Sequence, residues 1–224
     1  MNNNYLEVVY NPENKPYTDY PKKLVKYLAE RYQMKPGDKF LELGCGRGDF
    51  LNEFTEIGLE TYAIDNNDYF KKNLKTNNFF KVDMTKSQLP FEENSFDIVY
   101  SKSFIEHFYY PEEIFKEALR ILKPGGKFIN LTPDWETIYK SFYEDYTHRT
   151  PFTVTSLKDI YSINGFKNTL VEKFKQLPIL WDRGFVAKFL SEVTRIIAPN
   201  QLNKKYKWVR FSKEIMLLSS GQKK

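Results

Sequence analysis

A glycine-rich segment is well suited to bind a ligand through its backbone. Gly44, Gly46 and Gly48 alternate with other residues directly after the largely apolar run 40–43. Glycine has no Cβ and tolerates positive φ, so such a loop between a strand and a helix lets the main chain approach a ligand closely. Dinucleotide sites use the wider spacing G-x-G-x-x-G. The spacing G-x-G-x-G therefore argues against a dinucleotide.

Carboxylates at the ends of the predicted strands indicate the charge of the ligand. Glu42 lies two residues before Gly44, where a negative charge would repel a pyrophosphate and attract a cation. Asp65 ends the next strand, where an acceptor can take both ribose hydroxyls of a nucleoside. Asp83 ends a third strand and is placed to accept an adenine amino group. Together these residues predict a cationic nucleoside ligand.

The two histidines are the candidate catalytic bases. His107 follows the predicted fourth strand, and His148 lies in the polar loop after the fifth. A general base that removes a proton from an acceptor hydroxyl typically accelerates a reaction by ~10²–10⁴-fold. The alternative for both is a structural histidine, hydrogen-bonded where a helix meets a loop. As the base we favour His148 over His107.

The elements that must position these residues alternate between strand and helix. Short apolar runs followed by turn residues predict strands, and apolar residues three and four apart predict helices. Such alternation is typical of a parallel sheet with helices on both faces. The predicted strands are 40–43, 61–64, 79–82, 96–100 and 127–131, and the predicted helices are 21–32, 50–58 (capped by Asp49), 68–75 and 111–122.

The pattern changes after residue 150. The sequence there predicts a helix at 155–163, a strand at 166–174, helical spacing over 179–197 and a last strand at 208–218. There is no internal repeat and no low-complexity linker. We therefore predict one domain over 1–224, with an N-terminal helical segment at 1–35 and a helical insertion at 176–207.

Two groups of aromatic residues fall at helical spacing. Aromatic residues at this spacing usually belong to the core. The alternative is a functional wall: an acceptor pocket for the first group, and a dimer contact or a pocket lid for the second. The first group is Trp135, Tyr139, Phe142 and Tyr143, and the second is Trp181, Phe185 and Phe189.

Five motifs, in order along the chain, resemble those of class I S-adenosylmethionine (SAM)-dependent methyltransferases. The resemblance covers roughly 36–175 and the closing strand. It implies an α/β, Rossmann-like three-layer sandwich with helices on both faces of a seven-stranded sheet, mostly parallel with the last strand antiparallel. The motifs are 41–48 (LELGCGRG), 64–65 (ID), 82–84 (VDM), 96–101 (FDIVYS) and 122–126 (LKPGG).

The resemblance implies that the cofactor is SAM and the product S-adenosylhomocysteine. SAM carries an ammonium and a sulfonium but no phosphate, which agrees with the carboxylates around the loop. The residues expected at the cofactor are Glu42, Gly44, Cys45, Gly46, Gly48, Asp65, Asn66, Asp83, Met84 and Ser101.

The stretch 106–165 is similar to bacterial methyltransferases of sugar, polysaccharide and natural-product pathways. We therefore expect a small-molecule or glycan acceptor, methylated on a hydroxyl oxygen. One alternative is an RNA methyltransferase, suggested by the net charge of +5. No separate RNA-binding module is visible, so we do not expect a nucleic-acid partner. The other alternative is a non-catalytic SAM-binding partner protein, against which the intact cofactor motifs argue.

A metal site is a further alternative. The small-RNA 2′-O-methyltransferases bind a divalent ion through a Glu-x-x-Glu-His motif and distant histidines, which Glu106, His107 and His148 match in part. Ser103 stands at the first Glu position, so one ligand is missing. We accordingly expect no metal.

Composition limits the setting of the protein. The chain has 224 residues, of which 41% are hydrophobic and 17% aromatic, as in a globular protein. One cysteine excludes an internal disulfide, and no apolar run reaches the ~18 residues of a membrane span. The first residues do not resemble a signal peptide. We expect a cytoplasmic protein with no membrane span, and a homodimer is possible through the insertion.

Overall fold

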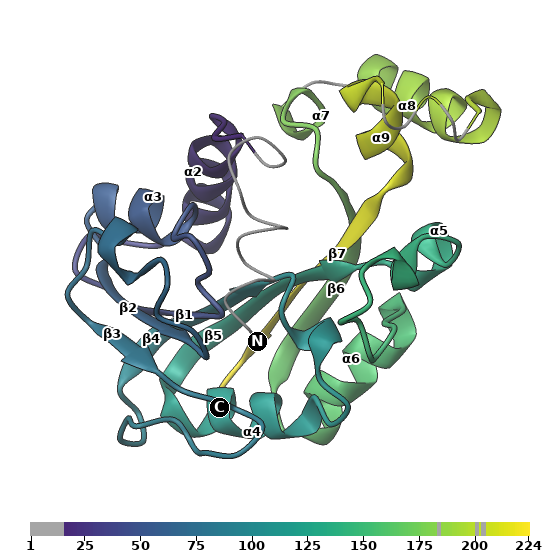
Figure 1. The fold of residues 1–224 in the computed structure, drawn as a ribbon. Coiled ribbons are helices and arrows are strands. Elements are labelled where there is room, and N and C mark those ends of the chain that lie inside the picture. Colours follow the sequence, from purple (N-terminus) through teal and green to yellow (C-terminus); the bar gives the residue numbers. More distant parts are fainter. Residues whose placement is uncertain (1–15, 183–184, 200–201, 203–204) are drawn as a thin grey trace.

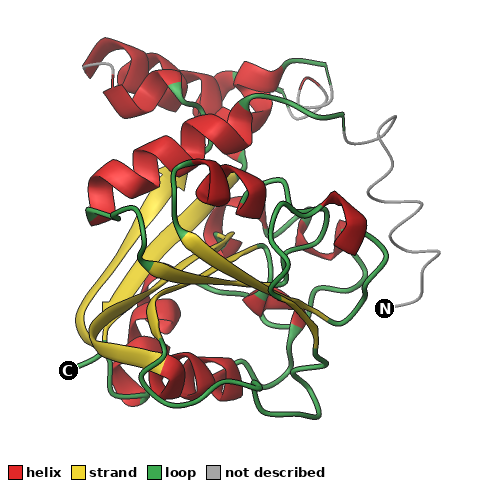
Figure 2. Cartoon of the chain, turned by 90° about the vertical axis from the view of Figure 1, so that its left-hand side faces the viewer, coloured by secondary structure: helices red, strands yellow, loops and turns green. Residues whose placement is uncertain are grey.

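A computed structural model describes residues 16–182, 185–199, 202 and 205–224. Within them one seven-stranded sheet has the order β3-β2-β1-β4-β5-β7-β6, and β7 runs antiparallel to both of its neighbours. The other adjacent strands pair in parallel. Helices flank the sheet on both faces (Figures 1 and 2). The predicted Rossmann-like fold is therefore confirmed.

The helices and strands have the following bounds. The strands are β1 (Lys39–Leu43), β2 (Glu60–Asp65), β3 (Phe79–Lys81), β4 (Phe96–Lys102), β5 (Leu122–Pro133), β6 (Lys167–Lys175) and β7 (Ile215–Gln222). The α-helices are α2 (Tyr20–Tyr32), α3 (Leu51–Glu56), α4 (Glu112–Ile121), α5 (Trp135–Ile138), α6 (Val154–Ile163), α7 (Ile179–Asp182), α8 (Phe185–Ile197) and α9 (Lys207–Lys213). Short 3₁₀ turns are η1 (Lys71–Asn73), η2 (Ile105–His107) and η3 (Phe142–Glu144).

Two hydrophobic cores lie on opposite faces of the sheet. Successive side chains of a strand point to opposite faces. In β1, Phe40 packs with α2 and α3, whereas Leu41 packs with α4 and α6. Leu24, Val25 and Leu28 of α2 are buried, as their spacing predicts. Both faces are covered, so the strands present their functional groups only at their ends.

The structure corrects four details of the predicted elements. The helix predicted at 68–75 is only the turn η1, because the Asn52 side chain bonds the main chain of Asn73 and Lys75. Asp49 does not cap α3: its carboxylate pairs with Arg47 at 2.6 Å.

The other two corrections concern β5 and β7. The strand β5 starts at Leu122, five residues before the predicted start, and residues 123–126 form an irregularity in its pairing with β4. The first half of the predicted last strand is the helix α9, which buries Val209 and Ser212, so the insertion continues to residue 214. Residues 1–15, 183–184, 200–201 and 203–204 of the predicted segments lie outside the described residues.

Candidate functional site

The glycine loop after β1 is held against β2 by main-chain hydrogen bonds. The amides of Gly44 and Cys45 both donate to the Ile64 carbonyl, at 2.9 and 3.1 Å. Gly44, Gly46 and Gly48 have φ of +70°, +51° and +78°, in the left-handed region that favours glycine. A Cβ added at Gly46 would meet no atom of the described residues within 4 Å. The loop therefore presents bare backbone to open space at Gly46.

A cavity of about 180 Å³ lies on this loop, at the carboxyl ends of the first three strands. Ligands of open α/β sheets bind at this edge. Seven predicted residues line the cavity: Gly44, Gly46, Asp65, Asn66, Asp83, Met84 and His107. Sequence reasoning missed six further lining residues, although each lies next to a predicted one or just past the fourth strand: Ile64, Val82, Thr85, Ser103, Phe104 and Phe108.

The carboxylate of Asp65 engages the loop and also lines the cavity. One oxygen accepts from the Gly46 amide at 2.9 Å, and the other accepts from the Asn67 amide at 3.0 Å. Burial raises the pKa of Asp65, and these amides act in the opposite direction. Asp65 is thus positioned both to fix the loop and to accept ribose hydroxyls.

Asp83 is held as a charged acceptor beside the cavity. Its Oδ1 accepts from the Thr85 hydroxyl at 2.6 Å and from the Thr85 amide at 3.1 Å, and Lys86 pairs with Oδ2 at 3.0 Å. The bonds from Thr85 and Lys86 lower the pKa of Asp83. An ionised carboxylate here suits a donor such as an exocyclic amino group.

Four predicted cofactor residues do not line the cavity. Ser101 is fully buried within β4 and donates to Asn130 of β5 at 2.8 Å, so its side chain serves the sheet. Cys45 and Glu42 are buried against the sheet, and Gly48 faces away from the cavity. These four residues thus lie beside the loop or within the sheet, outside the lining of this cavity.

Glu42 is a buried carboxyl group behind the glycine loop. It is only 3% exposed, and its Oε2 has no hydrogen-bond partner among the described residues. Burial, together with the charges of Asp49 and Asp65, raises the pKa of Glu42 well above its usual range. A nearby cation would stabilise the ionised form.

Both histidines meet in one cluster. The ring centroids of His107 and His148 lie 4.9 Å apart, and Glu106 completes a group whose ligand-type atoms all lie within 4.8 Å of one another. Of the two histidines, His107 is the one that lines the glycine-loop cavity. His148 lies behind it and packs on Phe142, with ring centroids 4.5 Å apart. The geometry thus favours His107, whereas the sequence favoured His148.

The Nδ1 atom of each histidine ring lies beside an oxygen that can accept a hydrogen bond. The Thr147 hydroxyl donates to Asp145 at 2.6 Å and also lies 2.9 Å from the His107 Nδ1, to which it offers a lone pair as acceptor. The His148 Nδ1 lies 2.6 Å from the Phe142 carbonyl, which only accepts. In the neutral tautomer that carries its proton on Nδ1, each ring has a lone pair on Nε2. A neutral Nε2 can take up a proton or bind a metal.

Burial shifts the pKa values of His107 and Glu106 in opposite directions, each toward the neutral form. Burial, followed by the neighbouring His148, lowers the pKa of His107 below its usual value. Burial raises the pKa of Glu106 to about 7, and its Oε1 has no hydrogen-bond partner among the described residues. Its other oxygen accepts from the Thr132 hydroxyl at 2.9 Å. The cluster thus combines a neutral imidazole with a carboxyl group that can hold a proton.

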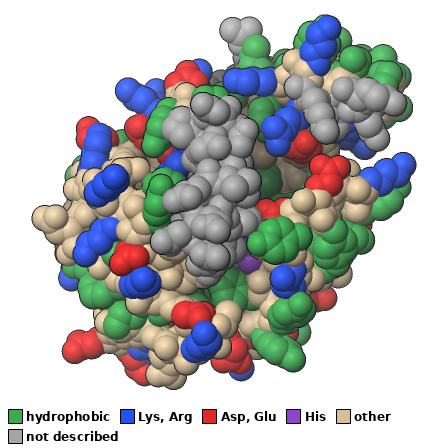
Figure 3. All heavy atoms as spheres, viewed as in Figure 1, with side chains coloured by type: hydrophobic (Ala, Val, Ile, Leu, Met, Phe, Trp, Pro, Cys, Tyr) green, Lys and Arg blue, Asp and Glu red, His purple; other side chains and the backbone are tan. Residues whose placement is uncertain are grey.

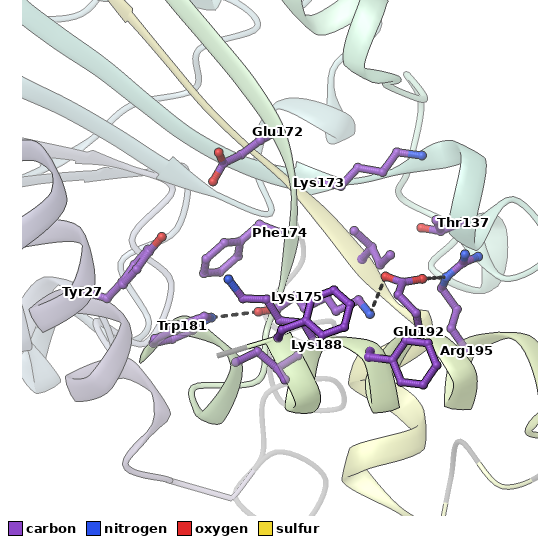
Figure 4. Close-up of a pocket in the computed structure, with 14 residues that line it drawn as sticks. Tyr27, Thr137, Glu172, Lys173, Phe174, Lys175, Trp181, Lys188, Glu192 and Arg195 are labelled. Carbon is purple, nitrogen blue, oxygen red and sulfur yellow. Dashed lines mark hydrogen bonds and ion pairs between the residues drawn. The ribbon is translucent and has the colours of Figure 1, made fainter. Parts of the chain in front are cut away.

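A larger cavity, of about 660 Å³, lies between α2, β6 and the helices α7 and α8 (Figure 4). Its lining mixes aromatic rings with charged groups. Trp181 donates to the Lys175 carbonyl at 2.9 Å, and Lys175 pairs with Glu192 at 2.7 Å. Ile215 at the start of β7 also lines it, opposite the carboxyl end of β6. The cavity therefore lies at the sheet edge that carries the glycine loop.

The two aromatic groups have mixed roles. In the first group Phe142 is buried, whereas Tyr139 and Tyr143 are exposed. In the second group Trp181, Phe185 and Phe189 line the larger cavity. The expectation that both groups belong to the core is correct for Phe142 and wrong for the exposed rings.

Comparisons with known proteins identify the class. A family profile described as "Methyltransferase domain" matches residues 41–130. Sterol 24-C-methyltransferase of Schizosaccharomyces pombe is 40% identical over 113 residues, which cover 46% of this chain and 29% of that protein. Phosphoethanolamine N-methyltransferase 2 of Caenorhabditis elegans is 27% identical over 77% of this chain and 43% of its own length. The chain spans less than half the length of these curated relatives.

Solved structures agree with this class. A SAM-dependent methyltransferase from Archaeoglobus fulgidus has a TM-score of 0.64 and 26% identity, covering 90% of this chain and 94% of its own. Residues 41–130 therefore match a methyltransferase domain, and the chain has the Rossmann-like fold of SAM-dependent methyltransferases. The resemblance to SAM-dependent methyltransferases that the sequence shows is therefore confirmed.

Asp65→Ala is expected to weaken SAM binding and to leave the fold intact. A hydrogen bond to a charged acceptor contributes about 1.5–3 kcal/mol, which corresponds to a loss of affinity of roughly 10–150-fold. Calorimetric titration with SAM measures the change, and Asp68→Ala is the matched control because this exposed carboxylate pairs with Lys81 outside the cavity. Equal affinities of the two variants would contradict the ribose contact.

Proposed function

We propose that this chain transfers the methyl group of SAM to a hydroxyl oxygen of a small-molecule or glycan acceptor. The observation that carries the proposal is the His107 ring, an imidazole that lines the cavity on the glycine loop. A hydroxyl must lose its proton as it attacks a methyl carbon, so it gains from a nearby base. A neutral amine is nucleophilic without one.

In this mechanism the chain aligns the reactants and removes one proton. When bound, SAM supplies a methyl carbon activated by its positive sulfur. The glycine loop and Asp65 orient the cofactor, and alignment alone can be equivalent to ~10⁵–10⁸ M effective concentration. His107 Nε2 accepts the hydroxyl proton while the new oxygen–carbon bond forms and the carbon–sulfur bond breaks. The Glu106 carboxyl group beside it would stabilise the resulting positive charge when ionised.

The larger cavity supports a small-molecule acceptor. Pockets of about 300–1,000 Å³ that combine apolar walls with a few polar groups are typical of such ligands. The aromatic lining of Phe174 and Trp181 suits an apolar body or a sugar ring, and Lys175 and Glu192 offer polar contacts. The relatives named above act on sterols and phosphoethanolamine, which makes these compounds the natural first comparison.

The test is an acceptor screen that measures release of S-adenosylhomocysteine. The panel contains nucleotide sugars, glycans and hydroxylated metabolites. It also contains a sterol, which tests for C-methylation, and phosphoethanolamine, which tests for N-methylation. The proposal expects turnover on a hydroxylated compound and an O-methyl product by mass spectrometry. Turnover confined to the sterol or the amine would overturn O-methylation. SAM binding without turnover on any arm would favour a non-catalytic partner protein.

RNA is the remaining rival, and we expect only weak RNA binding at physiological salt. A protein that grips single-stranded RNA releases counterions, so its affinity falls with salt at a slope of roughly −0.7 per phosphate contacted. Filter binding of total cellular RNA at two salt concentrations measures this slope. Turnover on the preferred soluble acceptor should change little between the same two salt concentrations. Tight binding with a steep slope, and labelled methyl groups recovered in RNA, would favour the rival.

A further inference from the structure

Much of the apolar side of α8 is exposed, although Phe185 and Phe189 on this side also line the rim of the larger cavity. Residues 185, 186, 189, 190, 193, 196 and 197 of this helix are all apolar and fall within one continuous arc of the 3.6-residue turn. Six of them are between 52% and 82% exposed: Phe185, Val186, Phe189, Leu190, Ile196 and Ile197. Figure 3 shows hydrophobic side chains beside Lys and Arg at the upper right, where α8 lies in Figure 1.

The polar side of α8 faces the rest of the chain. Ser191 is the buried residue of this helix, and its hydroxyl donates to Ser212 of α9 at 2.9 Å and accepts from Lys175 at 2.8 Å. Thr194 accepts from the Trp208 indole at 2.9 Å. A surface helix of a soluble protein normally buries its apolar face. This helix does the reverse, which marks its outer face as an interaction surface.

The net positive charge of the protein is concentrated in the same segment. Between β6 and β7, residues 176–214 contain eight basic and three acidic residues, a net charge of +5. The whole chain has 34 basic and 29 acidic residues, so the remaining 26 basic and 26 acidic residues cancel. The apolar face therefore belongs to the one segment that carries the excess charge.

We propose that α8 is an interfacial helix that docks the protein onto an anionic lipid bilayer. A helix with aromatic and branched aliphatic residues on one face, flanked by Lys and Arg, inserts that face at the level of the headgroups, and anionic lipids attract the basic residues. A second copy of the chain fits the surface less well, because it would bring a second +5 segment against the first. Vesicle binding is read without turnover, so the proposal stands or falls independently of the acceptor.

The test is co-sedimentation of the full chain with vesicles of phosphatidylcholine plus phosphatidylglycerol, and with vesicles of phosphatidylcholine alone. We expect binding to the anionic vesicles that weakens with salt. The double variant Ile196→Ser, Ile197→Ser should bind at least about tenfold more weakly, because each isoleucine gives up apolar burial in the bilayer. Neither residue lines a cavity named above, so SAM affinity reports whether the variant is folded.

The matched control is the double variant Ile163→Ser, Leu170→Ser. These side chains are also exposed, at 81% and 45%, but lie on α6 and β6 outside the segment. The control should bind vesicles like the wild type. Equal binding of both double variants, or no binding to anionic vesicles, would overturn the proposal. So would dimerisation in solution that the α8 variant abolishes while vesicle binding is absent, because a second copy would then cover this face.

Discussion

His107→Ala is expected to lower turnover by ~10²–10⁴-fold while SAM affinity changes far less, because the ring contributes a base and the loop contributes cofactor binding. The pH profile gives a second measurement. Burial and His148 lower the pKa of His107, so the wild-type imidazole stays neutral below its usual pKa of about 6.5. The acid limb of kcat/KM should therefore lie below that pH.

His148→Ala distinguishes catalysis from a structural role. Removing this ring removes a neighbour that lowers the pKa of His107, so that pKa should rise and activity should begin to fall at a higher pH. If His148 has only a structural role, the substitution should lower activity at every pH without shifting the acid limb of the pH profile. If His107→Ala keeps near wild-type turnover and an unchanged pH profile, His107 is not the general base. Loss of wild-type activity on chelation, restored by a divalent ion, would assign the Glu106 cluster to a metal instead.

The lining of the cavity on the glycine loop could largely be predicted, because the position of its residues follows from the order of strands and turns. Glycines at alternate positions and carboxylates at strand ends are local features, and the order of parallel strands brings those ends to one edge. Gly46, Asp65 and Asp83 accordingly lie where the sequence predicts. Ser101 does not, because β4 is covered on both faces and its apolar pattern does not tell which side chain faces a ligand.

Other features depend on contacts between distant residues. The helix predicted at 68–75 is replaced by a short turn through the side chain of Asn52, which lies about 20 residues earlier. The spacing within α8 predicts an amphipathic helix correctly. Its orientation depends on bonds from Ser191 to Lys175 and Ser212, which no local pattern reveals. Likewise, the cluster of His107 with His148 joins two loops that are 41 residues apart.

Gly46→Val is expected to reduce SAM affinity by at least about 100-fold, or ~2.7 kcal/mol. Gly46 has φ of +51°, and a Cβ there would enter space that the described residues leave open at the cofactor cavity. A valine would fill part of the volume that the ligand needs. It would also strain the backbone, since a branched residue in the left-handed region costs about 1–3 kcal/mol.

Gly37→Val separates these two effects. Gly37 has φ of +89°, and a Cβ there also meets nothing within 4 Å among the described residues, but it lies in the turn before β1, outside the cavity. Both variants should therefore lose a similar amount of thermal stability, while only Gly46→Val loses SAM binding by calorimetry. A folded Gly46→Val protein with wild-type affinity would show that the cofactor does not contact this loop. Equal loss of affinity in both variants would instead attribute the effect to backbone strain, because strain is the one change that the two substitutions share.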